Sequence, residues 1–108
     1  MICFTVWKSE NQYRGFESSG HAGYAEEGED IICAAVSALV INTVNSIEKF
    51  TEDGFRLEQA EDGGYLRLYF TGLPGEKAAL LMDSLVLGIS GIEADYGNEY
   101  ITLITREV

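Results

Sequence analysis

The stretch that decides the fold is residues 31–49, which read IICAAVSALVINTVNSIEK. Its first turns are apolar nearly all round, and polar residues return from Asn42 onward. A helix of that composition is buried on most sides, so we predict a helix that starts inside the protein and ends at its surface. Asp30 is the expected N-cap, because a carboxylate before the first turn accepts hydrogen bonds from unpaired N–H groups and complements the helix dipole.

Two strands are predicted before this helix. Residues 1–7 alternate between apolar and mixed positions, which is the pattern of a half-buried strand. A polar turn at residues 8–12 leads to a second strand at residues 13–19, in which Phe16 is the clearest core residue. We expect these strands to pair as a hairpin, and we interpret Cys3 as a buried structural thiol.

A second hairpin, a second helix and a last strand are predicted after it. Residues 55–60 and 65–71 form the hairpin, joined by the turn-forming sequence EDGG. Residues 76–88 carry an apolar stripe at helical spacing, and two glycines leave the end of this helix open. Residues 100–105 are the last strand. The order β-β-α-β-β-α-β predicts an α/β fold in the broad sense, an α+β sandwich with two helices packed on one mixed sheet.

The charge of the chain restricts its partners. The 108 residues hold 7 Lys and Arg against 18 Asp and Glu, which gives a net charge of −11. Binding to a phosphate backbone needs clustered basic residues, and here they are scattered along the sequence from Lys8 to Arg106. We therefore expect no nucleic-acid partner, and a basic protein or peptide instead.

Several features predict a cytoplasmic protein of one domain. The longest nearly apolar run, Ile31–Ile41, is too short to span a membrane, so no membrane partner is expected. No basic segment precedes an apolar one at the N-terminus, as it would in a signal peptide. Two cysteines are too few for a disulfide scaffold and are typical of intracellular proteins.

Residues 20–30 fit neither a helix nor a strand. They hold glycines at three positions and, near their end, four acidic residues within five positions. We interpret this segment as an exposed, mobile loop, and loops of that length in compact domains are often functional. The single histidine of the chain, His21, lies where the second strand gives way to this loop.

Cys33 falls in the first turn of the predicted helix if Asp30 is its N-cap. The unpaired N–H groups and the positive end of the dipole stabilise a thiolate there, which is the nucleophilic form of cysteine. A loop that folds back would set the His21 imidazole beside this thiol, and a Cys–His pair is the minimum for nucleophilic catalysis by a thiolate. The same N–H groups could bind an oxyanion.

Each of these residues also has a plainer interpretation. Cys33 could be an inert core residue, because cysteine is among the most buried residue types. Ser37, one helical turn later, could hydrogen-bond the thiolate or the histidine, or a carbonyl of its own helix. Asp30 could orient His21, as a carboxylate does in a triad, or simply cap the helix. Neighbouring acids disfavour a thiolate, so one hypothesis is that substrate closes the loop and activates Cys33.

The sequence holds no motif for a metal or a nucleotide. One histidine and two cysteines lack the paired spacing of a structural zinc site, and the acid run differs from an EF-hand loop. The glycines form neither a dinucleotide-binding nor a phosphate-binding pattern. Tyr65, Tyr69 and Tyr100 could form an exposed aromatic patch or merely cover a sheet.

Two segments carry a family resemblance: GHAGYA at residues 20–25 and GEDIICAAVS at residues 28–37. They closely resemble the signature of the ribosomal-processing cysteine proteases, the Prp (YsxB-like) family. The likeness extends over the whole chain in length and element order, and it implies a single cysteine protease domain over residues 1–108.

The resemblance implies roles for five residues. Cys33 would be the nucleophile and His21 its general base. Asp30 and Ser37 would support this pair, and Gly20 would be a hinge that lets the loop open for substrate.

The resemblance also implies a substrate and an assembly. The family is a homodimer that acts on the precursor of bacterial ribosomal protein L-twenty-seven, removes a short N-terminal extension by cutting next to an aromatic residue, and uses no metal or organic cofactor. An acidic enzyme and a basic ribosomal protein favour encounter. Two other functions fit the residues alone. One is a non-catalytic module that binds a basic ribosomal protein during ribosome assembly, and the other is a thiol-dependent acyl transferase or thioesterase.

Overall fold

The chain folds into one mixed sheet with two helices on it, which confirms the predicted α+β architecture and element order. The computed structural model describes residues 1–20, 29–61, 64–97 and 99–108. The five strands lie in the order β3-β4-β2-β1-β5. β1 (Ile2–Ser9) pairs in parallel with β5 (Ile101–Glu107), and the other neighbouring strands are antiparallel.

The first hairpin confirms the predicted pairing of the N-terminal strands. β2 (Gln12–Ser19) runs antiparallel to β1, with Val6 opposite Phe16. The turn is shorter than predicted, because Glu10 and Asn11 alone lie between the strands. Both residues have positive φ, 53° and 66°, as in a two-residue type I′ turn, whose twist matches that of the flanking strands.

The second hairpin is also confirmed, apart from its ends. β3 (Phe55–Gln59) pairs with β4 (Tyr65–Phe70), and β4 joins the first hairpin through β2. β3 and β5 are therefore the two edges of the sheet. The turn predicted at residues 61–64 lies partly outside the described residues.

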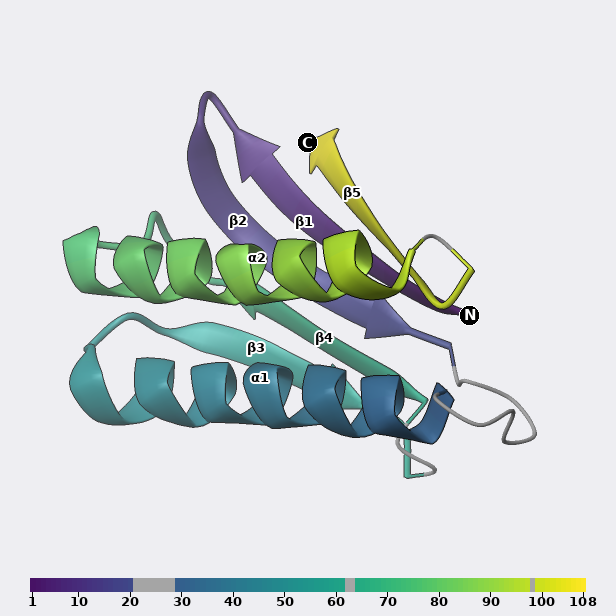
Figure 1. The fold of residues 1–108 in the computed structure, drawn as a ribbon. Helices are drawn as coiled ribbons and strands as arrows, with labels where there is room; N and C mark the ends of the chain where they lie inside the picture. Colours follow the sequence, from purple (N-terminus) through teal and green to yellow (C-terminus); the bar gives the residue numbers. More distant parts are fainter. Residues whose placement is uncertain (21–28, 62–63, 98) are drawn as a thin grey trace.

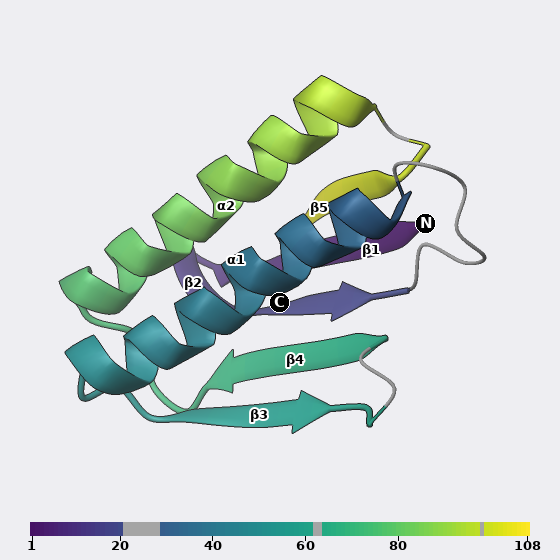
Figure 2. The same ribbon diagram turned by 60° about the horizontal axis from the view of Figure 1, so that its bottom comes forward.

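Both helices lie on the same face of the sheet (Figures 1 and 2). α1 (Glu29–Phe50) and α2 (Glu76–Tyr96) run side by side in opposite directions. The core lies between them and the sheet, where the rings of Phe4 and Phe16 stack with centroids 5.5 Å apart. This arrangement leaves the other face of the sheet without a helix.

The prediction for α1 is wrong in two respects. The helix begins at Glu29, so Asp30 lies inside its first turn and is not the N-cap. Acidic residues in a first turn complement the dipole as well as a cap does. The helix is also not buried on most sides, contrary to the prediction from its apolar composition. A stripe from Ile32 to Ile47 is buried, whereas Ile31 and Ile41 are 64% and 50% exposed, because the sheet and α2 cover only part of the helix.

The long apolar sequence of α1 is partly explained by its burial in the core. The helical stretch Ile31–Phe50 is long and apolar enough, by length and composition alone, to cross a membrane. The sequence analysis considered only the run Ile31–Ile41 and so underestimated the length of the apolar segment. Core helices of soluble proteins can be equally long and apolar. Here 33% of this stretch is buried within the fold, so core packing accounts for part of its apolar character.

α2 continues through the two glycines at which its prediction stopped. A Cβ on Gly88 would lie 2.9 Å from Cδ1 of Leu39, so this glycine allows α1 and α2 to approach closely. A glycine costs roughly 1 kcal/mol inside a helix relative to alanine, and the close approach of the two helices offsets part of this cost. Four residues form the buried stripe of α2: Ala78, Met82, Leu85 and Ile89.

The uncovered face of the sheet holds residues that alternate with the core. Cys3 points to this face and is only partly buried, so its prediction as a buried thiol is wrong. The three tyrosines considered as a patch divide between the two faces. Tyr65 and Tyr69 alternate with the inward-facing Leu68 on β4 and lie on the uncovered face, whereas Tyr100 packs against the core.

Candidate active site

One end of the molecule gathers the start of α1, the end of β2 and the start of β4 (Figures 1 and 2). Gly20, which follows β2, donates its N–H to the carbonyl of Gly64 at 2.9 Å. Its φ is +98°, and a Cβ there would lie 2.3 Å from the carbonyl oxygen of Met1. Glycine is therefore required at this position. It fixes where the chain leaves the sheet, directly before His21.

Cys33 lies near the start of α1. Because the helix begins at Glu29, Cys33 opens the second turn and does not lie in the first, as the sequence had indicated. Its side chain is partly buried and packs against the core. Cα–Cβ bonds in a helix tilt toward the N-terminus, so this position leans over the first turn, whose N–H groups have no partner within the helix. Cys33 therefore still lies close to the first-turn N–H groups, although it belongs to the second turn.

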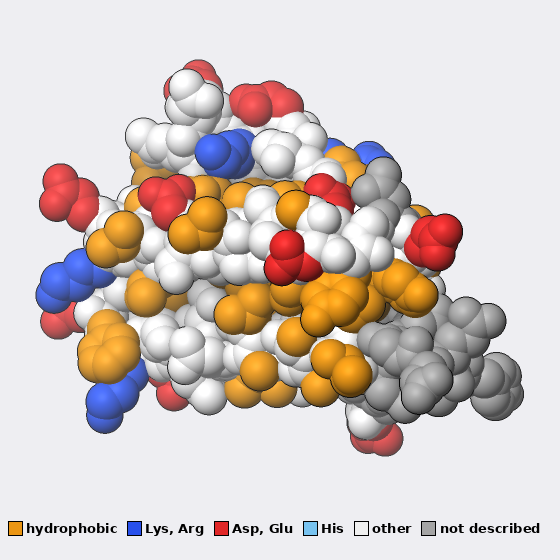
Figure 3. Space-filling model, viewed as in Figure 1, with side chains coloured by type: hydrophobic (Ala, Val, Ile, Leu, Met, Phe, Trp, Pro, Cys, Tyr) orange, Lys and Arg blue, Asp and Glu red, His pale blue; other side chains and the backbone are white. Residues whose placement is uncertain are grey.

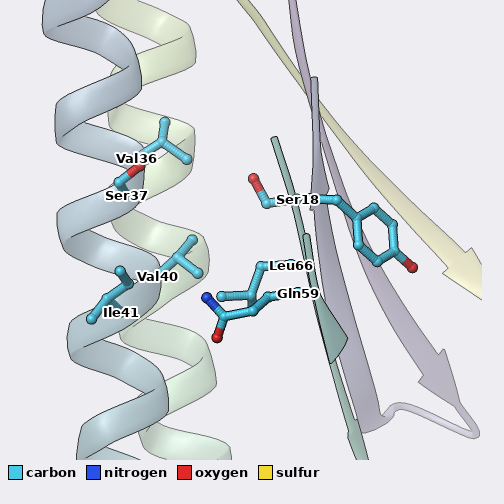
Figure 4. A pocket seen from close by; sticks show the side chains of 8 residues that line it. Ser18, Val36, Ser37, Val40, Ile41, Gln59 and Leu66 are labelled. Carbon is cyan, nitrogen blue, oxygen red and sulfur yellow. The ribbon is translucent and has the colours of Figure 1, made fainter. Parts of the chain in front are cut away.

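A hollow of about 110 Å³ lies between α1 and the sheet, one helical turn beyond the cysteine. Ser18, Gln59 and Leu66 point into it from the strands, toward Val36 and Val40 of α1 (Figure 4). Its lining is completed by Ser37, Ile41 and Tyr65. An apolar hollow with a few polar groups suits the side chain of a bound peptide.

Ser37 is exposed at this hollow, four residues after Cys33 and so on the same face of α1. Thr43, in the same helix, donates its hydroxyl to the Leu39 carbonyl at 2.7 Å. In the described part of the chain, Ser37 makes no such bond. The plainer interpretation, a hydrogen bond to its own helix, therefore does not hold, and the hydroxyl can serve a ligand.

The sequence analysis missed Ser18 and Gln59. Both flank Leu66 in one row across the sheet, on the face that α1 covers. Polar residues at inward-facing strand positions are unusual unless a partner or a ligand satisfies them. The alternation of β2 carried this signal, because Ser18 falls on the same face as the fully buried Phe16.

A hydrogen bond to Glu17 raises the pKa of Tyr65, burial adds to the rise, and Arg67 opposes it. Tyr65 is the first residue of β4, so it stands at the same end of the sheet as the start of α1. Its phenol therefore stays protonated at neutral pH, and it points to the uncovered face of the sheet, away from the hollow.

Two predicted site residues cannot be placed. His21 lies outside the described residues, as does most of the predicted loop, and Asp30 is described as helical backbone alone. The pairing of Cys33 with His21 and the support from Asp30 therefore stay predictions. The end of β2 and the start of α1, which flank this segment, do lie at the same end of the molecule (Figure 2).

No metal centre is formed by the residues that the structure describes, since no three His, Cys, Asp or Glu side chains among them are placed to share an ion. The arrangement can instead support chemistry at the thiol. A cysteine near a helix start, a hydroxyl one turn later and a hollow along the same helix define a candidate thiol hydrolase.

Comparison with known proteins gives this class a family. The family model described as "Cysteine protease Prp" matches residues 1–102. The chain is 37% identical over 101 residues to the ribosomal processing cysteine protease Prp of Bacillus subtilis, covering 89% of this chain and 90% of that protein. It is 31% identical over 84 residues to the Staphylococcus aureus protein of the same name, covering 78% of each. The chain therefore belongs to the cysteine protease family Prp.

Solved structures agree with this assignment. The S. aureus protease in complex with a covalently linked product peptide superposes with a TM-score of 0.88 at 27% identity, covering 98% of this chain and 100% of that one. The same protease in complex with a substrate peptide gives a TM-score of 0.89 at 25% identity, over the same shares of the two chains. The family and the fold both make this chain a cysteine protease.

Proposed function

We propose that this protein removes the short N-terminal extension of the precursor of ribosomal protein L-twenty-seven, with Cys33 as nucleophile and His21 as general base. One observation carries the proposal. Cys33 stands near the start of α1, beside a hollow that the same helix lines, in a chain that matches a cysteine protease family over residues 1–102. Relatives named as ribosomal processing proteases support the choice of a ribosomal protein as substrate.

The proposed reaction passes through a thioester. The sulfur of Cys33 attacks the scissile carbonyl carbon while His21 takes the thiol proton. The tetrahedral oxyanion is held by N–H groups of the first turn of α1. The C–N bond then breaks, and His21 gives its proton to the leaving amine. Water, with its proton taken by His21, attacks the thioester and releases a carboxylic acid and the Cys33 thiol.

The remaining signature residues have supporting roles in this proposal. Asp30, in the first turn of α1, would orient the His21 imidazole. Ser37 would hydrogen-bond the bound substrate or the imidazole, which its exposure at the hollow supports. Gly20 would be the hinge of the segment that follows it, and its positive φ supports this role, because a glycine reaches backbone conformations that other residues do not.

The hollow would receive the aromatic residue next to the scissile bond. Val36, Val40 and Leu66 supply apolar contacts there, and Gln59 supplies an amide on the edge strand β3. An edge strand has unpaired N–H and C=O groups that can bind an extended peptide. A substrate lying between β3 and α1 would therefore pass the hollow before reaching Cys33.

We also propose that the protein is a cytoplasmic homodimer. Hydrophobic side chains gather over and between the helices in the view of Figure 3. Ile31 of α1 and Leu80 and Leu87 of α2 are 64%, 68% and 74% exposed. A second copy would cover them, since exposed apolar patches mark protein contacts. Equilibrium sedimentation tests this: the expected mass is twice 11.9 kDa, and Leu87→Glu is expected to favour the monomer.

Cleavage of a peptide tests the proposed function. The peptide spans the extension junction of the same organism's L-twenty-seven protein, and mass spectrometry identifies the products. One specific cut is expected, and both Cys33→Ala and His21→Ala should abolish it. Cys3→Ala is the matched control, because it removes the other half-buried thiol of the chain and should leave cleavage unchanged.

Two outcomes would contradict the proposal. An intact peptide after incubation with reduced wild-type enzyme at high concentration would favour the binding module, particularly if the peptide bound equally well to Cys33→Ala. Cleavage that survives Cys33→Ala would assign the reaction to other residues.

A further inference from the structure

The four arginines of the chain are far apart in sequence and lie on one face of the sheet. They are Arg14, Arg56, Arg67 and Arg106. Arg56, Arg67 and Arg106 alternate with inward-facing residues along their strands, so they project from the face of the sheet that carries no helix. Arg14 lies at the register shift between β1 and β2 and reaches the same face, where its Cζ atom lies over the Tyr69 ring. Lys49 and Lys77, in contrast, are on the helices. The scatter of basic residues in the sequence is therefore not a scatter in the fold.

Two aromatic residues and two of the arginines share one row across the sheet. The register places Arg56 opposite Tyr69, Tyr69 opposite Gly15, Gly15 opposite Trp7, and Trp7 opposite Arg106. The row crosses all five strands. Four spacings of about 4.8 Å make it roughly 19 Å long.

Gly15 allows the two rings to meet across the strand between them. Trp7 is on β1 and Tyr69 on β4, with β2 in between, yet their ring centroids are 6.0 Å apart. A Cβ on Gly15 would lie 2.2 Å from the carbonyl oxygen of Leu68. The middle of the row therefore has no side chain, and the rings lean over it from both sides.

Two of the four guanidinium groups, those of Arg14 and Arg67, lie against these rings. The Cζ atom of Arg67 is 4.8 Å from the ring centroid of Trp7 and 5.8 Å from that of Tyr69, and Cζ of Arg14 is 5.7 Å from that of Tyr69. Within the described part of the chain, none of the four arginines forms an ion pair. In a protein with 18 acidic residues, a face with four guanidinium groups and no ion pair calls for an anionic partner from outside.

Two hollows flank the Tyr69 ring on this face. One of about 270 Å³ is lined by Arg56, Glu58, Arg67 and Tyr69. The other, of about 200 Å³, is lined by Arg14, Arg56, Tyr69, Phe70 and Thr71. A water molecule fills about 30 Å³ in the liquid, so each hollow has room for a much larger group between guanidinium planes and a ring.

We propose that this arginine–aromatic face, composed of Trp7, Tyr69 and the four arginines, binds single-stranded nucleic acid. Bases stack on the two rings and on guanidinium planes, and phosphates pair with Arg14, Arg56 and Arg106. The proposal is independent of the proteolysis, because the face lies on the other side of the sheet from the hollow beside Cys33.

The rings decide between a polynucleotide and an acidic peptide. Carboxylates would pair with the guanidinium groups but would leave Trp7 and Tyr69 unused, whereas every base has a planar surface that stacks on an aromatic ring. The row of roughly 19 Å suits a strand that crosses the sheet. A polynucleotide therefore uses both kinds of side chain on this face.

The net charge of −11 weakens this binding without preventing it. Charges are screened over about 8 Å at physiological ionic strength, and the molecule is 22 Å across in its thinnest dimension. Acids on the helical side are therefore largely screened from the arginine–aromatic face. Glu17 and Glu58 lie one row away on the face itself, so Glu58→Gln is expected to tighten binding.

The test uses Trp7, the single tryptophan of the chain, as its probe. Oligouridylate and oligothymidylate of about ten nucleotides are titrated into the full-length protein while tryptophan fluorescence is followed. Stacking on Trp7 is expected to quench it. Raising the salt from about 50 mM to about 200 mM should weaken binding about twentyfold, because pairing with three phosphates gives a slope of roughly −2 on a log–log plot.

Two double variants with equal charge change separate the face from general electrostatics. Arg14→Ala with Arg56→Ala should weaken binding at least roughly tenfold. Lys49→Ala with Lys77→Ala removes the same charge from the helical side, where both lysines are exposed, and should leave affinity within about twofold. Tyr69→Leu should weaken binding roughly tenfold through lost stacking. Circular dichroism confirms that each variant is folded.

Several results would overturn the proposal. They are an unchanged Trp7 fluorescence, equal losses in the arginine and lysine variants, and equal competition by polyglutamate, which carries charge but no bases. A fluorescence that depends on protein concentration and not on oligonucleotide would show that a second copy of the chain covers the face. Binding of both oligonucleotides, or of oligouridylate alone, would support the proposal that this face binds single-stranded nucleic acid. Binding of oligouridylate alone would also show recognition of the 2′-hydroxyl.

Discussion

The two helices are alike in length and apolar character but differ in role. α1 and α2 have 22 and 21 residues, are similarly apolar, and lie on the same face of one sheet. α2 approaches β5 and β2 closely, whereas α1 has its close approach to α2. The hollow beside Cys33 lies where α1 stands off from the sheet. Apolar composition predicts that a helix packs, but the distance at which it packs decides whether it can hold a site.

The hydrogen bonds of the two helices show the same difference. Asp83 of α2 accepts a hydrogen bond from the Tyr13 hydroxyl at 2.5 Å, and Glu93 accepts one from the Leu103 N–H at 2.7 Å. These bonds join α2 to β2 and β5. In α1, the side-chain hydrogen bond of Thr43 stays within the helix. α2 is thus the scaffold, and α1 is the helix that lines the hollow.

The largest expected effect comes from α1. Cys33→Ala should lower kcat for peptide cleavage by about 10⁴-fold or more, because a missing nucleophile leaves only binding and oxyanion stabilisation. The free energy of unfolding should change by less than about 1 kcal/mol, since the side chain is small and half-buried. Steady-state kinetics and urea denaturation measure the two quantities. If the free energy of unfolding fell so far that unfolding alone explained the lost activity, Cys33 would be a core residue.

A substitution in the core of α2, in contrast, should affect stability alone. Met82 is fully buried, and Met82→Ala should lower the free energy of unfolding by about 3 kcal/mol through the cavity that it leaves. Cleavage per folded molecule, measured well below the melting temperature, should stay within about threefold of wild type. If kcat fell with Met82→Ala as it does with Cys33→Ala, the division of roles between the helices would be wrong.

The bond between Tyr13 and Asp83 gives a pH dependence. Burial, with the hydrogen bond and charge of Asp83, raises the pKa of Tyr13 above its ordinary value. A raised pKa in the folded state means that its contribution to stability is present below about pH 10 and is lost as the pH rises further. Tyr13→Phe should therefore cost about 1 kcal/mol at pH 7. Its difference from wild type should shrink above about pH 10, as measured by urea denaturation across that range.

The smallest effect concerns the contact between the helices. A Cβ on Gly91 would have nothing within 4 Å, so Gly91→Ala should raise the free energy of unfolding by about 0.5–1 kcal/mol through helix propensity. Gly88→Ala should gain less, because its Cβ would meet Leu39 at 2.9 Å. Thermal melts compare the pair. Equal gains would mean that α1 and α2 do not depend on the close approach at Gly88.

Local pattern was enough to predict most of the fold. Alternation in β1 and β4 and helical spacing in α1 and α2 are properties of neighbouring residues, and the elements they predicted are present. The burial of α1 could not be read in this way. Ile31 and Ile41 look like core residues in sequence, and their exposure depends on which sides the sheet and α2 happen to cover.

The candidate site was predicted in part. Cys33 and Ser37 share a helix, so their common face follows from spacing alone. Ser18 and Gln59 come to the same hollow through strand pairing, which links residues distant in sequence. The four arginines show the same limit, because their gathering on one face is a consequence of topology that composition does not reveal.

The central claim is that the start of α1 carries the reacting thiol, and the chain provides its own control. Cys3 and Cys33 are both half-buried, one on the uncovered face of the sheet and one in α1. Limited treatment with iodoacetamide, followed by peptide mapping and an assay of residual cleavage, compares them directly. We predict that Cys33 is alkylated ahead of Cys3 and that activity falls in step with unmodified Cys33. Full cleavage by enzyme alkylated at Cys33, or a loss that follows Cys3, would contradict the account.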